Sequence, residues 1–176
     1  MNIQLFRIIN SWAGQNNFLD VFFVIGAKYV IFLIILIAVV FLFFREYRRS
    51  AIRAFVVAAV AVSFNYLVLS SLFFRQRPYL ILENVNKLVE HFSEKSFPSD
   101  HATVAFGVAL TIFLFHRRIG LPLVILAVWV AFGRVFVGVH LPGDVVGGLI
   151  VALFFTLVIN HKFGPRLRDN LKISIK

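Results

Sequence analysis

The chain of 176 residues contains no cysteine, and only 15% of its residues are charged. The absence of cysteine excludes disulfide bonds and thiolate metal sites. A soluble domain usually has about 25% charged residues, whereas 60% of the residues here are hydrophobic. A soluble fold cannot bury that much apolar surface, so the composition excludes an ordinary soluble domain.

The apolar residues are gathered into long runs. A helix needs about 20 apolar residues to cross a hydrocarbon layer about 30 Å thick. The sequence therefore predicts an all-α integral membrane protein, and because it contains neither internal repeats nor low-complexity tracts, we expect a single membrane domain over residues 1–176. Five full transmembrane helices are expected, over residues 18–44, 51–73, 101–115, 119–137 and 144–159.

Residues 1–17 mix polar and apolar side chains and lack the three-part pattern of a signal peptide, so we expect no cleavage there. Leu5, Phe6, Ile9 and Trp12 fall on one face of a helix. That periodicity is typical of a helix that lies in the membrane interface. We therefore expect an interfacial helix on the outer surface, before a transmembrane bundle over residues 18–160.

Two interruptions of the apolar pattern predict irregular structure. Asp20 and Lys28 lie in the outer half of the long first span, which we expect to be tilted, or broken near Gly26. Residues 74–100 carry much of the remaining polarity and are expected to form an outer loop with one short helix over residues 80–91.

Basic residues outnumber acidic residues by 18 to 8, and the excess is concentrated on one side of the predicted membrane. Alternating loops assign 11 basic and 2 acidic residues to that side, against 7 basic and 6 acidic residues on the other. The positive-inside rule makes the first side cytoplasmic, including a basic tail over residues 161–176. Because the charge follows membrane topology, it does not indicate a nucleic-acid partner. The 11 basic residues are Arg45, Arg48, Arg49, Arg53, Arg117, Arg118, Lys162, Arg166, Arg168, Lys172 and Lys176.

Three segments at the outer ends of the predicted spans carry side chains that a simple membrane anchor does not need. They are residues 75–78 (RQRP), 98–101 (PSDH) and 133–144 (GRVFVGVHLPGD). Ionisable groups at that depth are costly and usually functional. Helix packing can bring the three segments together although they are far apart in the sequence.

The first chemistry that these segments predict is phosphate binding. Arg77 and Arg134 can hold phosphate oxygens bidentately and neutralise negative charge in a transition state. Ser99 adds a hydroxyl donor. Pro98 suits the first turn of a helix, so the free backbone amides of residues 99–101 are expected to point at the same anion.

The second chemistry is nucleophilic attack. If a helix begins near Pro142, the carboxylate of Asp144 can fold back to the imidazole of His140 four residues earlier. A carboxylate on one ring nitrogen fixes the tautomer and leaves the other nitrogen free to attack phosphorus. His101 is then the candidate general acid. Asp100 either steers His101 and the substrate or starts the helix.

A metal site is the alternative use of the same groups. His101, His140 and Asp144 are residue types that bind zinc. The two neighbouring arginines would repel a cation, however, so we expect neither a metal nor any other cofactor.

In their order and spacing, the three segments resemble the signature motifs of the type 2 phosphatidic acid phosphatase (PAP2) superfamily, K-x6-R-P, P-S-G-H and S-R-x5-H-x3-D. The resemblance implies a PAP2-type helical bundle and a metal-independent phosphatase. It also implies a phosphohistidine intermediate on His140, proton donation by His101, and phosphate binding by Arg77, Ser99 and Arg134. The matching residues are Arg77, Pro78, Pro98, Ser99, His101, Arg134, His140 and Asp144.

Within that superfamily, the small size and the PSDH form of the second motif resemble bacterial undecaprenyl pyrophosphate phosphatases of the bacitracin-resistance type. This implies recycling of the cell-wall lipid carrier at the outer face of the bacterial plasma membrane. Three positions depart from the general pattern: Ser70 stands in place of lysine, Asp100 in place of glycine and Gly133 in place of serine. Arg75 either supplies the charge of the missing lysine or is a solvated loop residue.

Two alternatives to this function stay open. One is the same chemistry on phosphatidic acid or phosphatidylglycerol phosphate. The other is a protein that binds or transports a phospholipid without cleaving it. An oriented pair such as His140 and Asp144 favours the enzyme, because a binder has no need of a nucleophile. Oligomeric state and lipid chain length are not encoded in these motifs.

Overall fold

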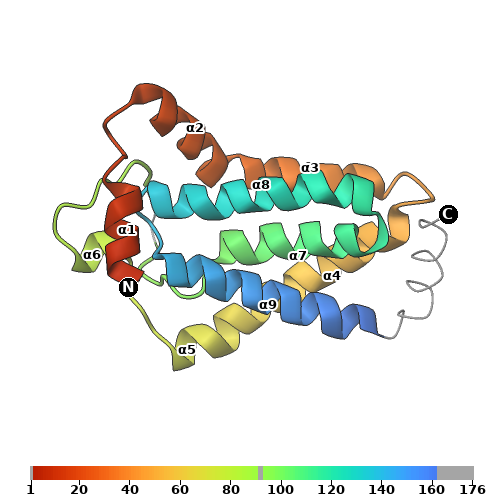
Figure 1. Ribbon diagram of the computed structural model, residues 1–176. Coiled ribbons are helices and arrows are strands. Elements are labelled where there is room, and N and C mark those ends of the chain that lie inside the picture. Colours follow the sequence, from red (N-terminus) through yellow and green to blue (C-terminus); the bar gives the residue numbers. More distant parts are fainter. Residues whose placement is uncertain (1, 91–92, 162–176) are drawn as a thin grey trace.

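The computed structural model describes residues 2–90 and 93–161, and this part of the chain is a bundle of helices joined by loops (Figure 1). The prediction of an all-α fold is confirmed. A π-helical turn, η1, covers Asn65–Leu69. The α-helices are α1 (Asn2–Asn10), α2 (Asn17–Lys28), α3 (Val30–Phe41), α4 (Arg48–Phe64), α5 (Ser70–Leu72), α6 (Pro78–Ile81), α7 (Asp100–Phe115), α8 (Arg117–Phe136) and α9 (Pro142–Asn160).

Helix α7 forms the centre of the bundle. It packs against α3, α4, α8 and α9, and nine of its 16 residues are buried. Several of these are small, including Ala102, Ala105 and Ala109. Small side chains let helix backbones approach closely where lipid supplies no hydrophobic driving force.

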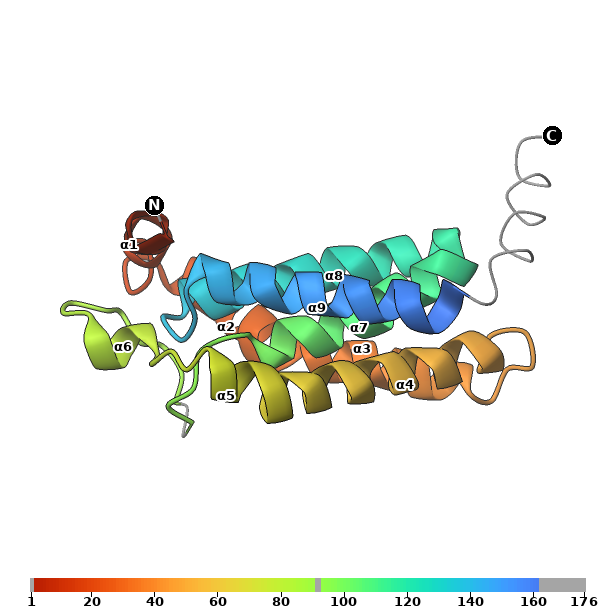
Figure 2. The ribbon, with the colours of Figure 1, turned by 90° about the horizontal axis from the view of Figure 1, so that it is seen from below.

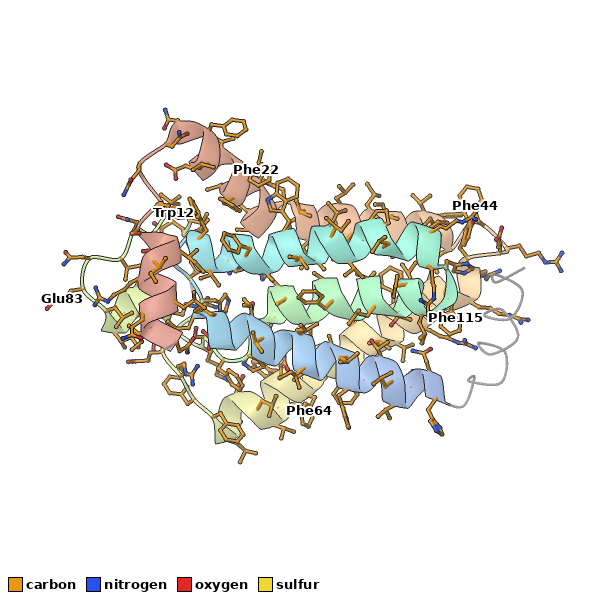
Figure 3. All side chains as sticks on the ribbon, in the orientation of Figure 1. Trp12, Phe22, Phe44, Phe64, Glu83 and Phe115 are labelled. Carbon is orange, nitrogen blue, oxygen red and sulfur yellow. The ribbon has the colours of Figure 1, made fainter. Side chains whose placement is uncertain are left out.

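The outer surfaces of the surrounding helices are covered by large apolar side chains (Figure 3). Phe32, Leu67 and Ile150 are each more than half exposed. Such a surface is unfavourable in water and suits contact with hydrocarbon. The surface and the apolar helices together make this a multi-pass membrane protein.

The expected number of spans is met only in part. Within the described residues, three helical segments are long and apolar enough to cross a membrane: residues 48–72, α8 and α9. The bent pair of α2 and α3 makes a fourth if it counts as one span. Helix α7 has 16 residues, which is short of the roughly 20 that a full crossing needs. The count of five therefore stays a prediction.

The first span is broken, as one of the two expectations had it. Helices α2 and α3 meet at an angle of 44°, and the break falls at Tyr29, three residues after Gly26. Gly26 has a packing role instead, because a β-carbon there would lie 2.6 Å from the indole nitrogen of Trp129.

The prediction of a helix over residues 80–91 is wrong for the residues that the structure describes. Helix α6 ends at Ile81, and Asn84 then adopts a positive φ of 56°. The physical reason is competition from other partners. The Asn86 amide and carbonyl bond to the side chain of Asn10, each at 2.9 Å, and the Leu88 amide donates to the Val137 carbonyl.

Helix α1 lies crosswise to the long helices at one end of the bundle (Figure 2). Its expected apolar face is divided: Phe6 is buried in the core, whereas Leu5 and Trp12 are exposed. A position in the membrane interface stays a prediction.

The two ends of the bundle differ in what they carry. We call the end with α1, α6 and the connection from α8 to α9 the site end; the connections from α3 to α4 and from α7 to α8 lie at the opposite end (Figure 1). Trp12 and Glu83 mark the site end, and Phe44 and Phe115 the opposite end (Figure 3). The basic tail expected over residues 161–176 lies outside the described residues except for His161.

Close packing at Gly133 gives a testable stability prediction. A β-carbon at Gly133 would lie 2.8 Å from the backbone nitrogen of Ala27 and 2.9 Å from the Phe23 carbonyl. Because backbone cannot move aside cheaply, Gly133→Ala should lower the free energy of unfolding by about 1–3 kcal/mol. Gly107→Ala is the control. Its added methyl would lie 3.5 Å from the Val57 side chain, an ordinary van der Waals distance, and alanine has the higher helix propensity.

Thermal unfolding of the two purified variants in detergent checks this prediction. We expect a lower Tm for Gly133→Ala and no decrease for Gly107→Ala. Equal Tm values for both variants and the original chain would contradict the close approach of α2 to α8.

Candidate active site

All three motif segments meet at the site end. The first is fixed to the loop before the second by two backbone hydrogen bonds, from the Arg77 amide to the Glu94 carbonyl and from the Ser96 amide to the Arg75 carbonyl. The second is fixed to the third because the Ser99 amide donates to the Asp144 carbonyl at 3.0 Å. Main-chain contacts therefore position the side chains described below.

A tight turn between α8 and α9 presents His140 to the site. Gly138 has a positive φ of 83°, a conformation that glycine adopts without steric cost. A β-carbon there would also lie 2.7 Å from the Asn86 carbonyl. Helix α9 begins at Pro142, which meets the condition stated for Asp144, and the Asp144 carboxylate folds back to accept the Leu141 amide at 2.8 Å.

His140 and Asp144 face each other in the buried interior of the site. The Nδ1 atom of His140 lies 3.8 Å from Oδ2 of Asp144, and the Nε2 atom lies 3.1 Å from Nη1 of Arg77. The carboxylate is thus on one side of the ring, and the other ring nitrogen faces a guanidinium. Such an orientation would allow nucleophilic attack on a phosphate held by Arg77.

Ser96 also belongs to this cluster, and no sequence motif indicated it. Its buried hydroxyl donates to Oδ2 of Asp144 at 2.5 Å and lies 3.4 Å from Nδ1 of His140. The only signal in the sequence is a hydroxyl residue two positions before Pro98. Serine is common in loops, so that signal could not have separated Ser96 from its neighbours.

The two motif arginines are buried in the site. Arg77 donates from Nε to the Ser93 carbonyl at 2.5 Å and from Nη1 to the Val139 carbonyl at 2.9 Å. Burial lowers the pKa of Arg77 from its ordinary value, yet an arginine remains charged at neutral pH. Arg134 donates from Nη1 to the Ala27 carbonyl at 3.3 Å.

Unpaired donors remain in this part of the described chain. The Nε and Nη2 atoms of Arg134 and the hydroxyl of Ser99 are buried without a hydrogen-bond partner among the described residues. Buried polar groups are normally paired because leaving one unpaired costs about 1–3 kcal/mol. Anions with several oxygens are the kind of ligand that such donors bind.

Arg75 is drawn into the site, but through the carboxylate. Its Nη1 atom lies 3.0 Å from Oδ1 of Asp144, and its side chain is 42% exposed. Its guanidinium also lies over the ring of Phe97. Arg75 is therefore not simply a solvated loop residue, and its exposed part is free to contact a substrate. Ser70, which replaces the motif lysine, is buried at the start of α5.

The start of α7 corrects one expectation. Helix α7 begins at Asp100, with Ser99 as an extended N-cap, so Pro98 lies before the helix and not in its first turn. The Ser99 amide is not free for an anion, because Asp144 uses it to tie α7 to α9. Asp100, whose Oδ1 accepts the Asn65 side chain at 3.0 Å, and His101 occupy the first two helical positions.

The balance of buried charge favours an anion over a metal cation. Among residues 2–90 and 93–161, the buried charged side chains are Arg77, Arg134 and Asp144. In the same residues, no three His, Cys, Asp or Glu side chains are grouped in a way that could hold a metal ion. The site therefore has the charge and the donors of a phosphate site.

Comparison with known proteins agrees with this chemistry. Residues 50–168 match the family model of the PAP2 superfamily. The chain is 30% identical to the undecaprenyl-diphosphatase BcrC of Bacillus subtilis (strain 168) over 178 residues, covering 100% of this chain and 91% of that one. It is 34% identical over 164 residues to a Bacillus licheniformis protein named bacitracin transport permease protein BcrC, covering 90% and 79% of the two chains.

A solved structure gives the same result for the fold. The crystal structure of Aquifex aeolicus LpxE superposes with a TM-score of 0.68 at 31% identity, over 90% of this chain and 93% of that one. The match covers most of both chains, so the arrangement of the helices is shared.

The burial of His140 predicts how stability depends on pH. Burial, and after it the charges of Arg134 and Arg77, lower the pKa of His140 to about 3 against the opposing effect of Asp144. The unfolded chain takes up this proton below pH about 6.5, whereas the folded chain does not. Stability from this residue is therefore complete above pH about 6.5 and decreases as the pH falls toward 3.

Between pH 7.5 and pH 5, the contribution of His140 to the free energy of unfolding should fall by about 2 kcal/mol. A decrease in Tm in detergent measures this loss. His140→Gln should lack this part of the decrease, while the exposed His161→Gln should behave like the original chain. If the Tm of the His140→Gln variant follows the same pH curve, His140 does not stay neutral in the folded protein.

Proposed function

Because the chain belongs to the PAP2 superfamily, we propose that it hydrolyses undecaprenyl pyrophosphate to undecaprenyl phosphate and inorganic phosphate. The observation that carries this proposal is the position of His140, whose Nε2 atom faces Arg77 while Nδ1 faces Asp144. The unpaired buried donors of Arg134 and Ser99 supply the rest of a phosphate site.

In the first step of this mechanism, the terminal phosphate binds under Arg77, Ser99 and Arg134. Its oxygens take up the donors that are unpaired without it, and they replace Nε2 of His140 as the acceptor of the Arg77 bond. Guanidinium groups neutralise the charge on the equatorial oxygens as the phosphoryl group is transferred. The Nε2 lone pair of His140 then attacks phosphorus and displaces the lipid phosphate.

In the second step, water cleaves the phosphohistidine. His101 donates a proton to the leaving oxygen in the first step and, in its basic form, activates the water in the second. Asp144 stabilises the charged imidazole in between. Arg75, whose guanidinium is partly exposed beside Asp144, contacts the second phosphate of the substrate. Asp100 is the first residue of α7 and precedes His101.

The proposed orientation puts the site end on the extracytoplasmic face of the bacterial plasma membrane. Arg45, Arg48, Arg117 and Arg118 lie on or next to the connections at the opposite end (Figure 1), where the positive-inside rule favours the cytoplasm. An outer site suits recycling of the cell-wall lipid carrier, which the resemblance to the bacitracin-resistance type implies. The C-terminus is then cytoplasmic.

Two rival functions remain as outcomes of experiment. Phosphatidic acid and phosphatidylglycerol phosphate have the same terminal phosphate, so the site chemistry alone does not select between them and the pyrophosphate. A lipid binder or transporter would use the arginines without cleavage, and the name of the Bacillus licheniformis relative contains the word transport. The oriented His140 favours cleavage.

The first prediction from this function concerns the nucleophile and the substrate. Purified protein in detergent with EDTA should release phosphate from undecaprenyl pyrophosphate faster than from phosphatidic acid. His140→Ala should reduce release at least about a thousandfold, because it removes the attacking nitrogen. The control is His161→Ala, which changes an exposed histidine beyond α9 and should keep full activity.

If phosphatidic acid is hydrolysed faster, the proposed substrate is wrong and the proposed mechanism is retained. Absence of release from either lipid, by protein that unfolds cooperatively on heating, would instead favour the binding or transport function.

The second prediction concerns His101. When a diphosphate is cleaved, the leaving group is itself a phosphate whose second pKa is about 6, so this group needs little protonation. His101→Ala should therefore reduce kcat for both substrates, but the fold-loss for a phosphate monoester lipid should exceed the fold-loss for undecaprenyl pyrophosphate by a factor of at least about ten. Steady-state kinetics of the variant on both lipids at one pH measures this, and equal losses on the two substrates would refute His101 as the general acid.

A further inference from the structure

The distance between His140 and Asp144 is too long for a direct hydrogen bond. Their closest atoms, Nδ1 and Oδ2, lie 3.8 Å apart, whereas such bonds to a carboxylate are about 2.7–2.9 Å long. The Ser96 hydroxyl reaches both atoms, at 3.4 Å from Nδ1 and 2.5 Å from Oδ2. From this arrangement we infer that Ser96 is a positioning residue that couples His140 to Asp144 through its hydroxyl group.

The direction of each hydrogen bond follows from the groups involved. A guanidinium can only donate, so the Arg77 bond at 3.1 Å makes Nε2 of His140 an acceptor. A neutral imidazole with an accepting Nε2 carries its proton on Nδ1. The N–H group at Nδ1 then donates to the Ser96 oxygen. The Ser96 hydroxyl in turn donates a hydrogen bond to Asp144, which as a carboxylate can only accept.

The carboxylate is held where it is by its other partners. Oδ1 of Asp144 accepts Arg75 at 3.0 Å, and Oδ2 accepts the Leu141 amide at 2.8 Å. A move of Asp144 toward the imidazole would weaken both bonds. Ser96 is fixed as well, because its amide donates to the Arg75 carbonyl at 2.8 Å. The hydroxyl bridge is therefore the connection that this packing allows.

The bridge has a defined task in the reaction, and this part of the inference rests on the proposed function. When the Nε2 lone pair forms the bond to phosphorus, the bond from phosphorus to the leaving oxygen breaks, and the ring becomes positively charged. The proton on Nδ1 stays in place. The Ser96 hydroxyl, polarised by its hydrogen bond to the Asp144 carboxylate, then stabilises the charged ring and keeps the ring plane directed at the phosphate.

A spectroscopic experiment tests the bridge without any lipid. Nitrogen-15 NMR of histidine-labelled protein in detergent, with the His140 signals identified by their loss in His140→Gln, reports which ring nitrogen carries the proton. We expect Nδ1–H in the original chain and faster exchange of this proton with water in Ser96→Ala. A proton on Nε2, or an exchange rate that Ser96→Ala leaves unchanged, would overturn the inference.

A kinetic experiment tests the role in catalysis. Ser96→Ala should reduce kcat about 10- to 100-fold, the range for a lost hydrogen bond to a charged group, with KM changed less than about twofold. Ser96→Thr keeps the hydroxyl and should recover most of kcat. Ser71→Ala, at an exposed serine of α5 outside the site, is the control and should match the original chain.

A double variant separates coupling from independent effects. If Ser96 acts through Asp144, Ser96→Ala combined with Asp144→Asn should lose no more kcat than the worse of the two single variants. Losses that multiply, or an unchanged kcat in Ser96→Ala, would overturn the inference. If the original chain releases no phosphate from either lipid, the proposed function fails, and the NMR result still decides whether the bridge exists.

Discussion

The residue on which the site depends is Asp144, because it joins all three motif segments. Its side chain accepts Arg75 from the first segment, Ser96 from the loop before the second, and the Leu141 amide at the start of α9. Its carbonyl accepts the Ser99 amide at the start of α7. A buried carboxylate costs several kcal/mol unless it is paired and hydrogen-bonded. Because these bonds satisfy it, Asp144 ties the ends of α7 and α9 to the segments that carry Arg75 and Ser96.

The second consequence of burial is an excess of positive charge. Asp144 is occupied by Arg75 and by neutral donors, so the buried Arg77 and Arg134 bond to main-chain carbonyls. Carbonyl dipoles compensate a guanidinium less completely than a carboxylate does. The site thus keeps unpaired donors and uncompensated positive charge, which lowers stability and suits the phosphate binding proposed above. Such a balance between stability and function is typical of sites that are preorganised for a charged ligand.

Packing of the helices explains one departure from the superfamily pattern. Gly133 stands where the pattern has serine, and in this chain the backbone of α2 lies against it. The neighbouring Arg134 reaches the Ala27 carbonyl in the same helix. The broken first span therefore contributes to the site, since the Ala27 carbonyl of α2 accepts a hydrogen bond from Arg134. The pattern alone could not indicate this, because α2 carries none of its residues.

The sequence alone determined the membrane class, the all-α fold and the identity of the residues that gather at one end, because hydrophobic runs and motif spacing are local properties of the chain. It also indicated that Asp144 can fold back toward His140 if a helix begins near Pro142. Only the tertiary structure placed Ser96 between them, gave Arg75 its carboxylate partner and replaced the helix expected over residues 80–91 with a loop bonded to Asn10. The physical reason is that these features depend on hydrogen bonds between segments far apart in the sequence, where competing partners decide the outcome.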